Sequence, residues 1–227
     1  MSLFVWYDFS VVNRVNANVH AVLLDWDGTL LNSYAADASA YLTMFGALGI
    51  DWGLREIERH YSPDWYRVYR AARIPRAKWT EADRLWRLAY AREAPALLPG
   101  ARGVLRSLKR RFRLGVVTSG SRSRVRRQLR TFDLGKYFAT CICSEDAPRK
   151  KPHPAPLHLA LERLRAHPEE CVYAGDAPED IEMARRAGVR AIGVLGPFPT
   201  AERMRAAQPE VLLGSIRELP QYLRRPQ

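Results

Sequence analysis

The stretch Val19-His20-Ala21-Val22-Leu23-Leu24-Asp25-Trp26-Asp27-Gly28-Thr29 joins a short apolar run to a polar turn. The run from Val19 to Leu24 has the length of a buried strand. The polar cluster around Gly28 requires a turn directly after it. We therefore predict a strand that carries two carboxylates, Asp25 and Asp27, at its carboxyl end.

The same pattern of an apolar run followed by polar residues or glycine returns four times. These runs are Leu114–Val117 before Thr118-Ser119-Gly120, Tyr137–Cys143 before Ser144, Cys171–Ala174 before Gly175-Asp176, and Ala191–Val194 before Leu195. The segments between them have helical periodicity: Ala101–Phe112, Arg122–Phe132, Pro154–Arg165 and Ile181–Ala187. Alternating strands and helices predict an α/β fold with a doubly wound, Rossmann-like parallel sheet.

One segment interrupts this alternation. Residues 34–96 have only helical periodicity, between the turn-like borders Leu31-Asn32-Ser33 and Leu97-Leu98-Pro99-Gly100. We predict an all-helical cap at 34–96 inserted into a core formed by 1–33 and 97–227. The tryptophans of the insert at 52, 65, 79 and 86 are expected to pack in its own core, and residues 1–18 to form an arm or an added edge strand.

The charge of the chain is concentrated in one region. The 227 residues carry a formal net charge of +12, and 101–130 contains eleven basic residues without an acid. Such a block is typical of a surface that attracts anions, including nucleic acid. Because Val125, Leu129 and Phe132 recur at helical spacing, two solvated helix faces are the favoured interpretation.

The sequence also indicates where the protein resides. No apolar stretch approaches the length of roughly 18 residues that a membrane helix needs, and Asp8 and Arg14 interrupt the apolar N-terminal region. We expect a soluble cytoplasmic protein without a signal peptide or membrane contact. No feature specifies its oligomeric state.

The residues at the strand ends permit a specific chemistry. Asp25 and Asp27 are two positions apart on an extended segment, so both side chains can face one side. Strand ends of a parallel sheet meet at one edge, which adds Thr118, Ser119 and Asp176. Several carboxylates together repel each other unless a cation holds them, and oxygen ligands favour Mg²⁺. The alternative role of Asp176 or Asp180 as a helix N-cap is compatible with metal binding.

Four ordered motifs resemble those of the haloacid dehalogenase-like hydrolase superfamily, in its phosphoglycolate phosphatase-like branch. They are Asp25-Trp26-Asp27-Gly28-Thr29-Leu30, Val116-Val117-Thr118-Ser119, Lys151-Pro152-His153-Pro154, and Gly175-Asp176 through Asp180. The resemblance covers roughly 19–225 and implies that Asp25 is the nucleophile and Asp27 the general acid and base. It implies that Thr118, Ser119 and Lys151 bind the phosphoryl group. Asp25, Asp27 and Asp176 would ligate Mg²⁺ with support from Asp180.

The chain departs from the family pattern at Trp26, at Ser119 and at Lys150. The last two concern the phosphate contacts, and Lys150 could compete with Lys151. Dehalogenation is disfavoured because Asp27 is the acid of the phosphoryl-transferring members. Phosphonate cleavage would need a cap lysine, for which the insert offers Lys78.

The resulting hypothesis is a Mg²⁺-dependent phosphatase that hydrolyses a small phosphorylated metabolite such as a phosphoglycolate-like compound, a sugar phosphate or a nucleotide. A sugar-phosphate mutase would share all four motifs and is the first alternative. A nucleic-acid-binding protein that uses the block at 101–130 is the less favoured one.

Overall fold

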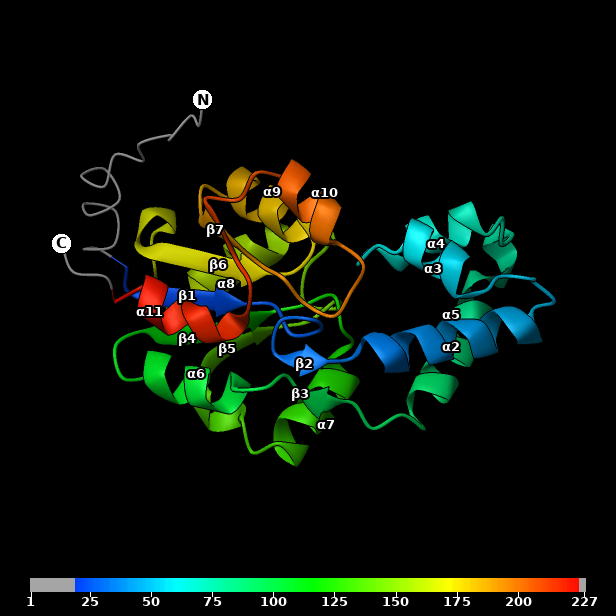
Figure 1. Cartoon of the computed structure of the whole chain (residues 1–227), viewed down its shortest axis with the longest axis horizontal. Helices are drawn as coiled ribbons and strands as arrows, with labels where there is room; N and C mark the ends of the chain where they lie inside the picture. The colour runs from blue at the N-terminus through cyan, green and yellow to red at the C-terminus, as the bar shows by residue number, and fades with distance from the viewer. Residues whose placement is uncertain (1–18, 225–227) are drawn as a thin grey trace, which may run out of the picture.

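The centre of the molecule is a parallel β-sheet. The computed structural model describes residues 19–224, and within them six strands form this sheet in the order β5-β4-β1-β6-β7-β8. Their bounds are Phe138–Ile142, Arg113–Val117, Ala21–Leu24, Cys171–Gly175, Arg190–Val194 and Val211–Leu213, in that order. The predicted doubly wound parallel sheet is therefore confirmed (Figure 1).

Strand β1 lies in the interior of the sheet and pairs in parallel with β4 on one side and β6 on the other. All four of its residues are buried. Val22 and Leu24 join the hydrophobic cluster on one face, and Ala21 and Leu23 join the cluster on the opposite face. An apolar residue at every position is what a strand covered on both faces requires, and it fixes the place where the chain turns polar at Asp25.

Helices cover both faces of the sheet (Figure 1). Side chains of α6 (Ala101–Leu108), α7 (Arg122–Thr131) and α11 (Leu219–Tyr222) pack into the first cluster. Those of α8 (Ala155–Leu164), α9 (Pro178–Arg186) and α10 (Ala201–Ala206) pack into the second. Each crossover thus returns the chain to the edge where the strands begin, so that the strands run in one direction and their carboxyl ends collect at the opposite edge.

A separate group of helices lies between two short strands. Strands β2 (Leu31–Asn32) and β3 (Ala96–Leu97) pair antiparallel, and the chain between them forms α2 (Tyr34–Ala47), α3 (Leu54–His60), α4 (Trp65–Ala71) and α5 (Trp79–Tyr90). We call these four helices and their connections, residues 34–90, the helical unit. It has a hydrophobic core of its own, to which Tyr41, Phe45, Ile57 and Val68 contribute.

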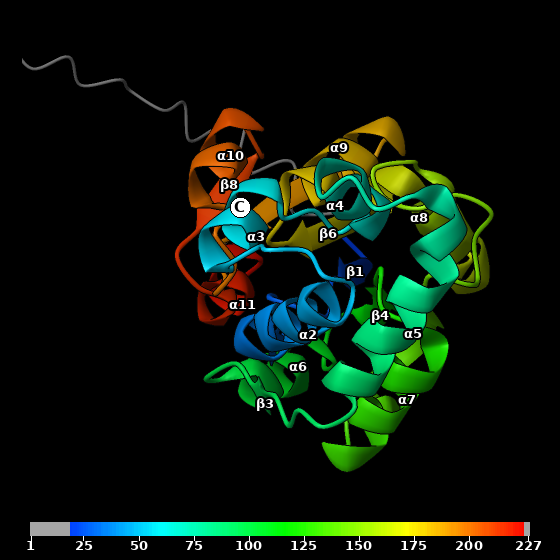
Figure 2. The ribbon, with the colours of Figure 1, turned by 90° about the vertical axis from the view of Figure 1, so that its right-hand side faces the viewer.

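The helical unit faces the carboxyl ends of the sheet strands. The arrow of β1 points toward it in Figure 1, and Figure 2 looks across α2 and α5 onto the strand ends. Contacts between α2 and α5 hold the unit together. The polar residues that follow β1, β4 and β6 therefore lie between the sheet and the helical unit.

The basic block at 101–130 lies on α6, on α7 and around β4. Its members at 106, 109, 110, 111, 113, 122, 126, 127 and 130 are exposed, as expected for solvated helix faces. The arm or edge strand expected at 1–18 falls outside the described residues. Within the described part of the chain, none of the helices combines the length and the apolar character that a membrane span needs.

Candidate active site

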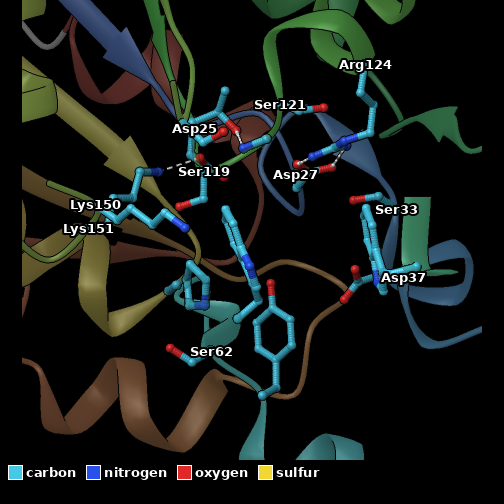
Figure 3. Close-up of a pocket in the computed structure, with 18 of the residues that line it drawn as sticks. Asp25, Asp27, Ser33, Asp37, Ser62, Ser119, Ser121, Arg124, Lys150 and Lys151 are labelled. Atoms are coloured by element: carbon cyan, nitrogen blue, oxygen red, sulfur yellow. Dashed lines mark hydrogen bonds and ion pairs between the residues drawn. The ribbon is translucent and has the colours of Figure 1, made fainter. Parts of the chain in front are cut away.

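The strand ends and the helical unit enclose one large cavity of about 280 Å³ (Figure 3). All residues predicted for the site line it: Asp25, Asp27, Thr118, Ser119, Lys151, Asp176 and Asp180. They come from the ends of β1, β4 and β6, from the start of α9 and from the loop before α8. Residues up to 155 positions apart in the sequence are thus brought to one place because parallel strands end at one edge.

Lys151 connects the carboxylates at the centre of the site. Its ammonium group donates to Asp25 Oδ1 over 2.6 Å, to Asp180 Oδ1 over 2.7 Å and to the Tyr173 hydroxyl over 2.7 Å. The side chains of Lys151, Asp25 and Asp180 are all less than one-tenth exposed. Three partners satisfy the three N–H donors of the ammonium group, which is what burial of a lysine requires.

The carboxylates of Asp25, Asp176 and Asp180 approach one another. One oxygen from each of them lies within 4.8 Å of the other two, and all three residues are buried. Burial raises the pKa of Asp25 to about 7 against the attraction of Lys151, and the charge of Asp180 adds to the increase. Burial and the same neighbouring carboxylates raise the pKa of Asp176 far above its usual range. One lysine therefore does not neutralise the cluster.

Asp27 has a different partner from Asp25. Its two carboxylate oxygens accept hydrogen bonds from Arg124 on α7, over 2.8 Å to Oδ1 and 2.6 Å to Oδ2. Burial by itself would raise the pKa of Asp27, but the charge and hydrogen bonds of Arg124 hold that pKa below its usual value. Arg124 belongs to the basic block that we expected to be solvated, so for this residue the expectation was wrong.

The second motif contributes two hydroxyl groups to the cavity. Thr118 is buried, and its Oγ1 accepts a hydrogen bond from the Gly120 backbone N–H over 3.0 Å. The Oγ of Ser119 is buried and has no hydrogen-bond partner among residues 19–224. A buried hydroxyl without a protein partner at a cavity wall can bind a ligand oxygen.

Lys150 and Lys151 point to different partners. The Lys150 ammonium group lies 3.1 Å from the ring centre of Trp65 and 4.1 Å from that of Tyr66, both on α4. Loss of hydration on burial lowers the pKa of Lys150 to about 8. Lys151 alone thus contacts Asp25, and Lys150 instead joins the loop before α8 to the helical unit by cation–π contacts.

The helical unit supplies an aromatic wall to the cavity. Trp52 and Trp79 pack in the core of the unit as expected. Trp65 and Trp86 pack against the same core but also line the cavity, together with Tyr41, Tyr61, Tyr69 and Tyr90. All four tryptophans thus pack against the core of the insert as expected, and two of them line the cavity as well.

Several contacts hold the helical unit against the rest of the molecule. Ser62 Oγ donates to Glu179 Oε1 on α9 over 2.8 Å in a buried hydrogen bond. Arg203 on α10 donates to the Tyr61 carbonyl over 3.0 Å, and the Tyr61 ring stacks on Phe198 with centroids 4.5 Å apart. These contacts join the helical unit to α9, to α10 and to the loop between β7 (Arg190–Val194) and α10.

Three residues of the site were not found from the sequence: Arg124, Tyr173 and Asp37. The spacing of Arg124 and Gln128, four residues apart on α7, places both on one side of the helix but does not show that this side faces the cavity. Tyr173 lies inside a buried strand, where an aromatic residue indicates packing. Asp37 lies in the first turn of α2 and lines the cavity.

Comparison with known proteins gives a consistent result. A family model described as haloacid dehalogenase-like hydrolase matches residues 22–194. Pyrophosphatase PpaX of Oceanobacillus iheyensis is 25% identical over 209 residues, which cover 89% of this chain and 95% of that protein. Phosphoglycolate phosphatase of Escherichia coli is 34% identical over 130 residues, which cover 57% of this chain and 52% of that enzyme.

Among solved structures, CbbY from Rhodobacter sphaeroides in complex with phosphate superimposes with a TM-score of 0.75. It is 28% identical, and the match covers 88% of this chain and 96% of that one. The family match extends over most of the chain and contains all the residues that meet at the strand ends. The chain therefore belongs to the haloacid dehalogenase-like hydrolase family.

Proposed function

We propose that this hydrolase is a Mg²⁺-dependent phosphatase of small phosphorylated metabolites that forms an aspartyl phosphate on Asp25. The observation that carries the proposal is the contact of Lys151 with Asp25 and Asp180 at the bottom of the cavity. A carboxylate held beside a buried cation can attack phosphorus while the cation stabilises the phosphoryl oxygens. The names of the relatives, a pyrophosphatase and a phosphoglycolate phosphatase, support this reaction class.

The donor set fits a magnesium ion. Three buried carboxylates with one lysine retain excess negative charge, and all the donors are oxygen atoms. Asp25, the backbone carbonyl of Asp27 and Asp176 would hold the ion, with Asp180 in support. When bound, Mg²⁺ would neutralise charge on the phosphoryl oxygens during transfer.

The chain's own residues would bind the phosphoryl group from three sides. Lys151 supplies positive charge, and the hydroxyl groups of Thr118 and Ser119 supply hydrogen bonds. The orphaned hydroxyl of Ser119 supports this assignment, because a phosphoryl oxygen would give it the partner that it lacks. This arrangement aligns the phosphorus atom with Asp25 for attack.

The reaction has two halves. An Asp25 carboxylate oxygen attacks phosphorus, the ester P–O bond breaks, and the leaving oxygen takes the bonding electron pair and a proton from Asp27. A water molecule then attacks the aspartyl phosphate and gives its proton to Asp27. Inorganic phosphate leaves, and the Asp25 carboxylate is restored.

We further assign the segment at 34–96 as a cap over a core formed by 1–33 and 97–227. The support is that the helical unit carries its own hydrophobic core and contributes the aromatic wall of the cavity. A cap in this position would exclude water from the phosphoryl group and contact the leaving group.

Phosphate release from p-nitrophenyl phosphate and a panel of metabolite phosphates, measured with and without Mg²⁺, tests the proposal. Asp25→Asn should abolish turnover, and Asp51→Asn, at an exposed acid after α2, should retain it. Absence of phosphate release by folded wild-type protein with Mg²⁺ would contradict the proposal. Transfer of the phosphoryl group to a second hydroxyl of the substrate would instead indicate the mutase alternative.

A further inference from the structure

We propose that Arg124 positions the Asp27 carboxyl group toward the leaving group and that Tyr90 makes this position depend on the helical unit. The inference rests on the proposed function, in which Asp27 transfers the proton. It assigns a role to a residue outside the four motifs. Arg124 acts through Asp27 and is therefore a positioning residue.

The contact between Arg124 and Asp27 fixes an orientation. Two parallel N–H···O bonds of 2.8 and 2.6 Å join the guanidinium group to both oxygens of the carboxylate (Figure 3). A bidentate pair of this kind restrains the carboxylate plane as well as its position, because the guanidinium donors form a rigid fork. A single hydrogen bond would leave the plane of the carboxylate free to rotate.

Arg124 itself is held in place on several sides. A Cβ atom at Gly120 would lie 2.4 Å from Arg124 Nη2, so the guanidinium group occupies space that a larger residue at this position would take. The neighbouring Gln128 is fixed in turn, because its Oε1 accepts a hydrogen bond from Trp26 Nε1 over 2.8 Å. Gln128 Oε1 lies 3.5 Å from Arg124 Nη1, so the guanidinium group contacts both Gln128 and Asp27.

The inward position of Arg124 is specific to this residue. Its side chain is 11% exposed, whereas that of Arg122, one of its neighbours on α7, is 44% exposed. Arg126 and Arg127 on the same helix are also exposed. The basic character of α7 does not explain why one arginine turns into the cavity.

Tyr90 connects this pair to the helical unit. It is buried at the end of α5, its hydroxyl lies 3.3 Å from Arg124 Nη1, and its ring centre lies 5.0 Å from the guanidinium carbon. The ring of Tyr90 also stacks on that of Trp86 on the same helix, with centroids 4.8 Å apart. A shift of α5 would therefore move a contact of Arg124 and, through it, Asp27.

The pair has a direct consequence for proton transfer. When Asp27 carries the proton for the leaving group, one of its oxygens is a hydroxyl, which is a weaker acceptor than a carboxylate oxygen, so the hydrogen bond from Arg124 to that oxygen is weakened. Delivery of the proton to the leaving oxygen restores the carboxylate and strengthens that bond. Arg124 therefore holds the carboxyl group in one orientation before the transfer and stabilises the carboxylate that forms.

Leaving-group dependence tests this role. An alkyl phosphate needs protonation of its leaving oxygen, whereas p-nitrophenyl phosphate leaves as a stabilised phenolate. Arg124→Ala should lower kcat/KM by about 10²-fold for the alkyl phosphate that the wild type hydrolyses fastest. For p-nitrophenyl phosphate the loss should stay within about threefold, since that reaction depends little on a general acid.

Further variants separate positioning from a structural effect. Arg127→Ala, at an exposed arginine of the same helix, should leave both substrates unchanged. Tyr90→Phe removes the hydroxyl contact and should give a smaller loss with the same substrate dependence. Arg124→Lys keeps the charge without the fork and should stay impaired with the alkyl phosphate. Arg124→Gln replaces the alanine variant if the latter does not fold.

Each outcome has a defined meaning. Equal losses for both substrates, no loss for either, or full activity of Arg124→Lys would overturn the positioning role while leaving the phosphatase proposal intact. Absence of wild-type turnover with both substrates would reject the proposed function and this inference with it.

Discussion

The ammonium group of Lys151 lies 2.6 Å from Asp25 Oδ1, and both side chains are almost completely buried. This contact is part of a cluster in which the lysine faces three carboxylates. The lysine therefore has two roles, one in the proposed mechanism and one in the stability of the folded protein. It would stabilise the phosphoryl group during transfer, and it already stabilises the folded protein against carboxylate repulsion.

Lys151→Met should destabilise the protein more strongly without Mg²⁺ than with it. Removal of one partner of a buried ion pair leaves an uncompensated charge and costs about 3–5 kcal/mol. For a chain of this size that corresponds to a decrease of about 10 °C in Tm. Thermal unfolding with and without saturating Mg²⁺ measures the effect, because a divalent cation would replace part of the missing positive charge.

Lys150→Met is the matched control for this experiment. It removes a lysine from the same loop, but one whose ammonium group contacts Trp65 and Tyr66 rather than a carboxylate. Its effect on Tm should be equal with and without Mg²⁺. An equal decrease for Lys151→Met in both conditions would contradict the charge argument.

A second prediction concerns the turn after Asp27. Gly28 has φ +78°, and a Cβ atom there would lie 2.1 Å from Asp176 Oδ2. Gly28→Ala should therefore cost at least about 2 kcal/mol of stability, because it combines a left-handed backbone with a steric clash. It should also displace Asp176 and lower Mg²⁺-dependent activity.

Gly46→Ala provides the comparison for that substitution. Gly46 lies in α2, and nothing approaches within 4 Å of a Cβ atom built there. Alanine should stabilise this helix by up to about 1 kcal/mol and leave activity unchanged. Paired chemical denaturation curves of the two variants give the difference. Equal stability of the two variants would refute the prediction.

The sequence predicted the centre of the site well for a simple physical reason. Asp25, Thr118 and Asp176 each follow an apolar run, and the ends of parallel strands meet wherever a doubly wound sheet forms. Local pattern was therefore sufficient to place them. For Lys151, in a loop with prolines, the resemblance of its motif carried the prediction.

Arg124 could not be placed by the same reasoning. Helical periodicity separates the core face of α7 from the rest, but it does not distinguish an arginine in solvent from one that faces another element. That distinction depends on what lies opposite α7, namely Tyr90 at the end of α5, more than thirty residues away in the sequence. The dual role of Trp65 and Trp86 was missed for the same reason, since the cavity exists only after the helical unit packs against the strand ends.

The last prediction concerns Asp37, which lines the cavity from the first turn of α2. Burial raises its pKa to about 8, and the charge of Asp27 adds to the increase against the attraction of Arg124. At a pH below its ordinary pKa of about 4, an acid whose pKa is raised in the folded state does not lower the stability of the protein, because it is protonated in both the folded and the unfolded chain. Stability is then lost as the pH rises through the interval up to about 8, because the unfolded chain releases its proton first.

Asp37→Asn removes this cost, since the amide carries no proton to release. The Tm difference between the variant and the wild type should therefore increase in favour of the variant from pH 4 to pH 8 and stay constant above it. Asp51→Asn removes an exposed acid beyond the end of α2. Its Tm difference from the wild type shows how the loss of one carboxylate changes Tm with pH, and this is the background for Asp37→Asn. A Tm difference for Asp37→Asn that does not change with pH beyond that background would mean that Asp37 is ionised in the folded protein throughout this range.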